Sequence, residues 1–303
     1  MVQKYTFRYF WDFAEPKSGM SHERTKSKHG NIVTVGGSGF GVMAVVVGVE
    51  RGFITREEGA KRLLKVTNFL KNTDRYHGMW SHWYSGETLK TYPFSKYDDG
   101  GDIVESSFMA QGLLTAFQYF TKNTIEEKKL RSEIKYLWET MEWDFYTNGQ
   151  DILFWHWSPN FGWKKQHGIR GYNECLITYV LAASSATHSI SAAPYHKGWM
   201  GKSDDTFLNY QTYYNISLPL GPKHQLGGPL FFEHYSYLGL DPRALSDKYA
   251  NYWEQVRRHT LINRAYCIDN PKKHKGYGEN FWGLTACDKV PKGYKAHAPG
   301  ERD

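Results

Sequence analysis

Four carboxylates fall within eight residues of one another, in a run that leads directly into a predicted helix. They are Asp98, Asp99, Asp102 and Glu105, with a glycine pair at 100–101 between them. We expect the glycines to form a tight turn that leaves Asp98 or Asp99 near the helix N-terminus, with Asp102 in the first turn and Glu105 one turn further. A helix N-terminus attracts anions, but capping uses one or two acids and not four. The surplus predicts a site that works with paired carboxylates.

Glu174 is the acid best suited to work with this cluster, because it falls in the first turn of another predicted helix, 173–188. Glycoside cleavage needs two carboxyl groups, which stand ~6.5–9.5 Å apart in inverting enzymes and ~5–5.5 Å apart in retaining ones. Asp102 and Glu105, one turn apart, would have Cβ atoms about 5–6 Å from each other. Glu174 could set a wider gap.

Aromatic side chains are abundant enough to line a sugar-binding groove as well as a core, since they make up 17% of the chain. Pyranose rings present apolar C–H faces that stack on aromatic rings, while their hydroxyls need polar partners. We therefore expect stacking from Trp155, Trp157, Trp199 and Trp282, and hydroxyl contacts from His156, His196, Lys197 and Asn280.

Helices must position these residues, because apolar residues recur at three- and four-residue steps and no long strand-like alternation competes. The pattern predicts helices over 103–120, 124–144, 173–188, 230–238 and 242–267, and a capping box at 55–58 begins another. Residues 1–39 and the aromatic loop 148–171 have no regular pattern. We expect an all-α fold, a single domain over residues 1–303, and a monomer.

Several other functions are disfavoured by composition. The net charge is +7 and the pI is near 9.0, but Lys and Arg are spread thinly, so we expect no nucleic-acid partner. Cys175, Cys267 and Cys287 form no C-x-x-C motif and no H-E-x-x-H is present, which favours buried small residues over a disulfide or metal site. We expect no cofactor.

Two apolar, glycine-containing stretches near the N-terminus also have simple interpretations. The G-x-G-x-x-A match at 39–44 is not followed by βαβ alternation, so it indicates a tight helix–helix contact rather than a dinucleotide site. The apolar run at 42–49 is far shorter than the ~20 residues of a membrane span. Residues 1–11 lack the apolar segment of a signal peptide.

A set of short motifs covers nearly the whole chain. Besides the acidic run, they are TFRYFW at 6–11, WHWSP at 155–159, GYNE at 171–174, YHKGW at 195–199, HYS at 234–236, NRAYC at 263–267 and WGLTA at 282–286. Together they resemble the glucoamylase-like family, which includes glycoside hydrolase family 144, the β-1,2-glucanases, and domains of cyclic β-1,2-glucan synthases.

The resemblance implies an (α/α)6 toroid with a central cavity, an inverting β-1,2-glucan hydrolase that needs no metal, and a periplasmic or secreted location. The family's D-x-x-x-D-x-x-E pattern falls on Asp98, Asp102 and Glu105, and its G-[WY]-N-E pattern falls on Glu174. The resemblance thus makes Glu174 the general acid, with Asp98 or Asp102 positioning or activating water. The linkage specificity rests on the resemblance alone.

Other interpretations stay open. About eight helices are predicted where a closed toroid needs twelve, so we expect a ring that is incomplete at the C-terminus. Such a toroid could bind sugar without turnover, or could act as an exo-acting or transglycosylating enzyme on the same glucan. A third possibility is a Mg²⁺-dependent isoprenoid synthase, because residues 98–102 match D-D-x-x-D. Those acids would have to lie on one continuous helix, which the glycine pair opposes.

Overall fold

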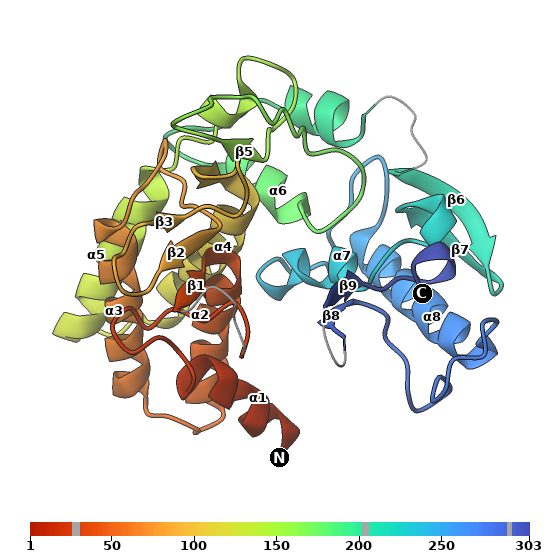
Figure 1. Cartoon of the computed structure of the whole chain (residues 1–303), viewed down its shortest axis with the longest axis horizontal. Helices are drawn as coiled ribbons and strands as arrows, with labels where there is room; N and C mark the ends of the chain where they lie inside the picture. Colours follow the sequence, from red (N-terminus) through yellow and green to blue (C-terminus); the bar gives the residue numbers. More distant parts are fainter. Residues whose placement is uncertain (26–30, 202–205, 290–292) are drawn as a thin grey trace. The chain divides into compact units, whose positions relative to one another are not determined.

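A computed structural model describes residues 1–25, 31–201, 206–289 and 293–303, and the chain divides into two compact units (Figure 1). Unit 1 comprises Met1–Gly168 and Val180–Ser191, and unit 2 comprises Ile169–Tyr179 and Ala192–Asp303. The boundary falls inside helix α6 (Leu176–Ser184). Each unit is described by itself, so a single domain over 1–303 stays a prediction.

Unit 1 is built on four long helices that pack in pairs, α2 on α4 and α3 on α5 (Figure 1). Its helical elements are α1 (Val2–Trp11), α2 (Val35–Glu50), α3 (Arg56–Asn72), α4 (Ile103–Tyr119), α5 (Ile125–Glu139) and the 3-10 turn η1 (Phe145–Thr147). A Cβ on Gly39 would collide with the backbone of Phe108, and one on Gly112 would collide with the carbonyl of Gly39. The glycine motif at 39–44 therefore serves a tight helix–helix contact, as its sequence context predicts.

Helix ends follow the sequence where capping residues are present. Thr55 and Glu58 form the predicted capping box of α3, and Thr124 caps α5. The interpretation of residues 1–39 as irregular was wrong, because they contain α1 and the start of α2. No side chain caps α1, and its single buried residue, Phe7, packs on α2 at Gly48, so the sequence carries little helical signal there.

Short strands form within the segments that connect the helices of unit 1. β1 (Ile32–Thr34), β2 (Trp83–Ser85) and β3 (Thr91–Tyr92) form an antiparallel sheet in that order. β4 (Gly101–Asp102) pairs with β5 (His156–Trp157), so that Asp102 lies opposite His156. This last register, within a stretch expected to be loop, brings the acidic run and the aromatic loop together.

Unit 2 combines one long helix with short turns and two hairpins. It contains η2 (Pro194–Trp199), β6 (Leu208–Tyr213), β7 (Ile216–Leu220), η3 (Lys223–Gln225), α7 (Phe231–His234), η4 (Ser236–Leu238), α8 (Tyr252–Asp269), β8 (Ala286–Asp288), β9 (Tyr294–Ala296) and η5 (Gly300–Arg302). Packing of β7 on α8 organises it (Figure 1). The β6–β7 hairpin was not predicted, because its two-residue turn places Tyr214 and Asn215 at positive φ without the usual Asn-Gly signal.

The described residues are mostly helical with short strands, which confirms the all-α class at this coarse level. Several boundaries were wrong: α8 begins at Tyr252 rather than near residue 242, α6 spans Leu176–Ser184 rather than 173–188, and α5 ends at Glu139 rather than 144. Cys175 and Cys267 are buried as expected, but Cys287 is exposed. Among the described residues, the helices are all too short or too polar to cross a membrane.

Candidate active site

Asp102 is the N-cap of α4, and its carboxylate organises the acidic run. Its Oδ1 accepts hydrogen bonds from the backbone N–H groups of Val104 (3.0 Å) and Glu105 (2.9 Å). The sequence analysis placed Asp98 or Asp99 at the helix start and Asp102 in the first turn. That prediction was wrong, because Asp102 itself is the N-cap. The glycine pair does not form a turn with positive φ; Gly101 belongs to β4, where a Cβ would collide with the hydroxyl of Tyr146.

Both oxygens of Asp102 are engaged. Oδ2 lies 3.2 Å from Nδ1 of His82 and 3.7 Å from Nδ1 of His156, which faces Asp102 across the β4–β5 pair. The residue is 0% exposed. Asp102 therefore fixes the helix end and the imidazole of His82, and it lies close to that of His156.

Asp98 lies before β4, between a histidine and a lysine. Its Oδ1 lies 3.0 Å from Nδ1 of His156, and its Oδ2 accepts a hydrogen bond from Nζ of Lys165 at 3.1 Å. Burial raises the pKa of Asp98, but His156 and Lys165 outweigh it, so the net pKa lies below the ordinary value of 3.8. Asp98 is therefore ionised at neutral pH.

Glu105 is the carboxyl of this group with the most unusual proton affinity. Its Oε2 accepts a hydrogen bond from the backbone N–H of Gly36 (2.8 Å), and its Oε1 lies 3.9 Å from Nε2 of His82. Burial raises its pKa, His82 lowers it and Asp102 raises it again, to about 7. Its side chain is 15% exposed. Asp98, Asp102 and Glu105 are called the acidic cluster below.

His82, Gly36 and Lys165 were missed by the sequence analysis as site residues. Burial lowers the pKa of His82, but Glu105 and Asp102 raise it to about 9, so its ring is cationic at neutral pH. Gly36 lies in the first turn of α2, where a Cβ would collide with the Glu105 carboxylate. In the sequence, the only signal for Gly36 was its position just before an apolar helical run. His82 was visible only as part of an aromatic loop.

Glu174 belongs to unit 2 and lies in a turn two residues before α6, not in its first turn as predicted. Asn173 closes this turn, because its Oδ1 accepts a hydrogen bond from the N–H of Cys175 (3.0 Å) and its amide donates to the carbonyl of Arg170 (3.2 Å). The structure thus brings Asp98, Asp102, Glu105 and His156 together in unit 1, and Glu174 is described with unit 2.

The predicted sugar-stacking residues divide into open and buried rings. Trp155 is partly exposed and stacks on His167, with ring centroids 5.1 Å apart, and Trp157 packs edge-on against His77 at 4.9 Å. Trp282 is 40% exposed. The expectation that Trp199 stacks on a sugar was wrong for this structure, because its ring is 0% exposed and packs against aromatic side chains.

The predicted polar contacts other than His156 lie in unit 2. Lys197 and Asn280 are exposed, and Nδ1 of His196 lies 2.9 Å from the hydroxyl of Tyr249. Their role in binding sugar hydroxyls stays a prediction.

Two alternatives can be judged from this geometry. The isoprenoid-synthase interpretation was wrong, because Asp98 and Asp99 lie outside α4 and the D-D-x-x-D acids do not share a helix. Asp98, Asp102 and His156 each offer a ligand atom within 4.8 Å of the others and could hold a metal ion. Lys165 and His82 already supply positive charge to the two aspartates, so no metal is required to balance them.

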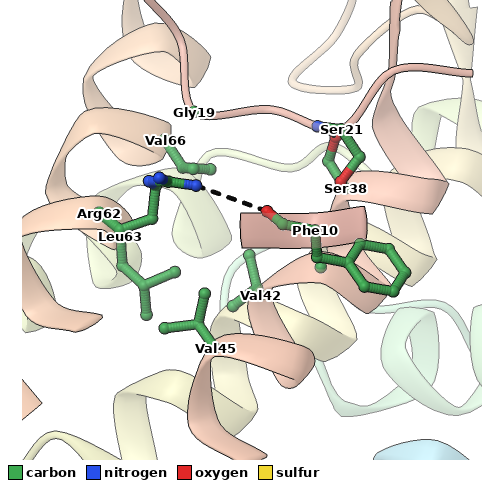
Figure 2. Close-up of a pocket in the computed structure, with 10 residues that line it drawn as sticks. Phe10, Gly19, Ser21, Ser38, Val42, Val45, Arg62, Leu63 and Val66 are labelled. Carbon is green, nitrogen blue, oxygen red and sulfur yellow. Dashed lines mark hydrogen bonds between the residues drawn. The ribbon is translucent and has the colours of Figure 1, made fainter. Parts of the chain in front are cut away.

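A separate cavity lies between α1, α2 and α3 in unit 1 (Figure 2). Its lining is largely apolar, and none of the predicted carboxylates contributes to it. Arg62 reaches into it and donates hydrogen bonds to the carbonyls of Phe10 and Trp11, at the C-terminal end of α1. The guanidinium therefore satisfies a helix end, and the cavity is a packing gap rather than a substrate site.

Comparison with known proteins identifies the family of this chain. Residues 166–303 match the family model described as "Putative glucoamylase". A solved structure of a putative glucoamylase from Bacteroides uniformis is 61% identical, with a TM-score of 0.96 over 100% of this chain and 73% of that one. The endo-β-1,2-glucanase from Chitinophaga pinensis, solved with sophorotriose and glucose, is 51% identical, with a TM-score of 0.93 over 100% and 74% of the two chains. The chain belongs to the glucoamylase-like family.

A curated relative of this glucoamylase-like chain has a named activity. The exo β-1,2-glucooligosaccharide sophorohydrolase (non-reducing end) from Parabacteroides distasonis is 47% identical over 95% of this chain, and the chain spans 42% of that protein's length. The family-model match contains Glu174 but begins after the acidic cluster. The solved relatives, in contrast, cover both units of the glucoamylase-like chain.

Proposed function

We propose that this glucoamylase-like chain hydrolyses β-1,2-glucan with inversion of configuration. The main observation is the acidic cluster, in which Asp98 is ionised and Asp102 shares His82 with Glu105, whose pKa is about 7. Names of the relatives support the substrate: one is a β-1,2-glucooligosaccharide sophorohydrolase and another an endo-β-1,2-glucanase. The proposal extends that substrate class to this chain.

Glu174 is proposed as the general acid that protonates the leaving glycosidic oxygen. In an inverting reaction a second carboxylate takes a proton from the attacking water. Asp102 is poorly suited to that role, since both its oxygens are engaged and it is 0% exposed. Asp98 is ionised but bound to His156 and Lys165, which leaves it a weak base.

Glu105 is the better base in the acidic cluster. A general base works best with a pKa near the working pH, and the pKa of Glu105 is about 7. Its side chain is also the most exposed of the three. The sequence analysis favoured Asp98 or Asp102 for activating water, and this proposal gives that role to Glu105 instead. Asp98 and Asp102 then orient His82 and His156.

Product analysis on linear β-1,2-glucan tests the proposal. The wild type, Glu174→Gln and the control Glu57→Gln, whose carboxylate is 70% exposed on α3, are incubated with the glucan with and without EDTA. We expect short oligosaccharides from the wild type and the control, unchanged by EDTA, and a loss of about 10²–10⁴-fold in rate from Glu174→Gln.

Two other outcomes would contradict the proposal, and the product size distinguishes its exo and endo forms. Retained glucan binding with no turnover by the wild type would support a sugar-binding module instead. Loss of activity in EDTA that Mg²⁺ or Zn²⁺ restores would point to a metal at Asp98, Asp102 and His156. Sophorose as the sole product would indicate exo action, and a ladder of oligosaccharides would indicate endo action.

Three broader properties accompany this proposal. The family resemblance supports an (α/α)6 toroid and a periplasmic or secreted location, and the monomeric state is proposed from the sequence analysis. Sedimentation of the purified chain and fractionation of the native source would test the last two.

A further inference from the structure

The segment that carries Glu174 is anchored on both sides by one short stretch of unit 2. Ser236 in η4 is 0% exposed, and its hydroxyl donates a hydrogen bond to the carbonyl of Glu174 (2.9 Å). The same hydroxyl accepts one from the N–H of Ile177 in the first turn of α6 (3.1 Å). One side chain thus fixes the backbone of residue 174 and the start of the following helix.

A second anchor acts two residues earlier. The hydroxyl of Tyr172 donates a hydrogen bond to Oε2 of Glu233 in α7 at 2.8 Å. Both residues are almost fully buried, and burial together with Glu233 raises the pKa of Tyr172 well above its ordinary value of 10. The tyrosine therefore stays a neutral donor throughout the pH range in which a hydrolase works.

Glu233 is itself held rigidly in place. Its Oε1 accepts a hydrogen bond from Nε2 of Gln255 (2.7 Å) and lies 3.0 Å from Nδ1 of His259. Nε2 of His259 lies 2.8 Å from the carbonyl of Gly228, to which it donates, because a carbonyl can only accept. The Glu233–His259 pair is 0% exposed at both residues, so its geometry has few alternatives.

We propose that Ser236 and Glu233 are positioning residues for catalysis: they set the Glu174 carboxyl through its own carbonyl and through Tyr172. This inference rests on the proposed function, in which Glu174 is the general acid. It explains why a 0% exposed carboxylate is kept in α7, where it costs desolvation free energy and touches no exposed surface. A displacement of about 1 Å in a catalytic group can cost about 10²-fold in rate.

Kinetics of Ser236→Ala and Tyr172→Phe test the inference. Each removes one anchor while leaving every catalytic carboxyl in place, and Tyr266→Phe is the matched control. Tyr266 is equally buried in unit 2, but its hydroxyl donates to Asp303 rather than to the Glu174 segment. We expect kcat to fall about 10–100-fold for the two anchor variants, with KM within about 2-fold, and the control to keep wild-type kcat.

The remaining outcomes separate this inference from the proposed function. If wild-type turnover and the Glu174→Gln loss are both seen but the folded anchor variants keep wild-type kcat, the positioning role is wrong and the proposed function stands. If KM rises while kcat is kept, the anchors serve substrate binding and the inference is also wrong. Should Tyr172→Phe fail to fold, Ser236→Ala, which removes one hydroxyl, decides the question alone.

Discussion

Both units bury a carboxylate beside a histidine, but the two arrangements differ in how completely they are satisfied. In unit 2, the Glu233–His259 pair is 0% exposed, and both carboxylate oxygens and both ring nitrogens have partners. In unit 1, Glu105 keeps part of its side chain exposed, and its Oε1 lies 3.9 Å from His82, beyond hydrogen-bond distance.

This difference separates support from chemistry. A buried pair whose hydrogen bonds are all made has no capacity left to bind a substrate or move a proton, and replacing it with apolar side chains often costs little stability. A partly exposed group whose pKa is shifted by burial can still take up and release a proton. We therefore expect substitutions in the acidic cluster to lower activity first, and single substitutions in the Glu233–His259 pair, which leave one partner buried alone, to lower stability first.

Glu105→Gln provides the strongest test of the unit 1 side of this comparison. A base must be ionised, so wild-type kcat/KM should rise with pH through the Glu105 pKa of about 7. The glutamine keeps the shape but cannot accept the proton, so we expect kcat/KM to fall about 10²–10⁴-fold and the rise near pH 7 to disappear.

Asp98→Asn is the matched control, because Asp98 is already ionised well below pH 7. We expect it to lower kcat/KM while keeping the rise near pH 7. A rise that survives in Glu105→Gln and vanishes in Asp98→Asn would assign the base to Asp98.

His259→Leu tests the unit 2 side. It leaves the Glu233 carboxyl buried without its imidazole partner, and a buried polar group left without a partner costs about 1–3 kcal/mol. The double variant Glu233→Met/His259→Leu should recover most of that free energy of unfolding in urea titrations, since no unpaired buried polar group of this pair remains. It should still have a low kcat, because Tyr172 has lost its acceptor. Equal loss of stability in the single and double variants would contradict the comparison.

Two tryptophans of unit 2 extend the comparison to aromatic rings. Trp199 is 0% exposed, so Trp199→Ala should lower the free energy of unfolding by about 3–5 kcal/mol. Trp282 is 40% exposed, so Trp282→Ala should leave stability nearly unchanged and raise KM for the glucan. Thermal unfolding and initial rates measure both. A normal KM in Trp282→Ala would remove that ring from the predicted sugar contacts.

Much of unit 1 was predictable because its signals are local. The capping box at Thr55 and the apolar steps of α4 are set by residues within a few turns of each other, and both are present as predicted. The close contact at Gly39 also followed from small residues in a helical run. The start of α6 could not be predicted, since it depends on the contact of Ser236 with Ile177. The start of α8 does have a local signal, the capping side chain of Asn251, which the sequence analysis overlooked.

The composition of the acidic cluster was predicted, but the roles of its members were not. Asp98, Asp102 and Glu105 could be chosen from charge and spacing alone. Their protonation depends on His82 and His156, whose rings reach the cluster through strand pairing and a loop rather than through a helical repeat. No sequence pattern encodes that meeting, so the proposal of Glu105 rather than Asp98 or Asp102 as the base required the structure.

The smallest expected effect concerns His82, because its charge links the acidic cluster to the stability of the fold. Its pKa in the folded chain is about 9, against an ordinary value of 6.5. A raised histidine pKa stabilises the fold fully below about pH 6.5, and this contribution is lost as the pH rises through 9. We expect the wild-type Tm to fall by a few degrees between pH 8 and pH 10, above the range in which Glu105 titrates, and His82→Gln to have a flatter curve.

His188→Gln is the matched control for that measurement. His188 pairs with Asp144 at 3.2 Å in unit 1, but both side chains are substantially exposed, so the pair contributes little and the variant should follow the wild-type curve. If His82→Gln also follows it, the His82 ring is not cationic in the folded chain. The pKa of Glu105 would then lie higher than 7, and the rise in kcat/KM would move to higher pH with it.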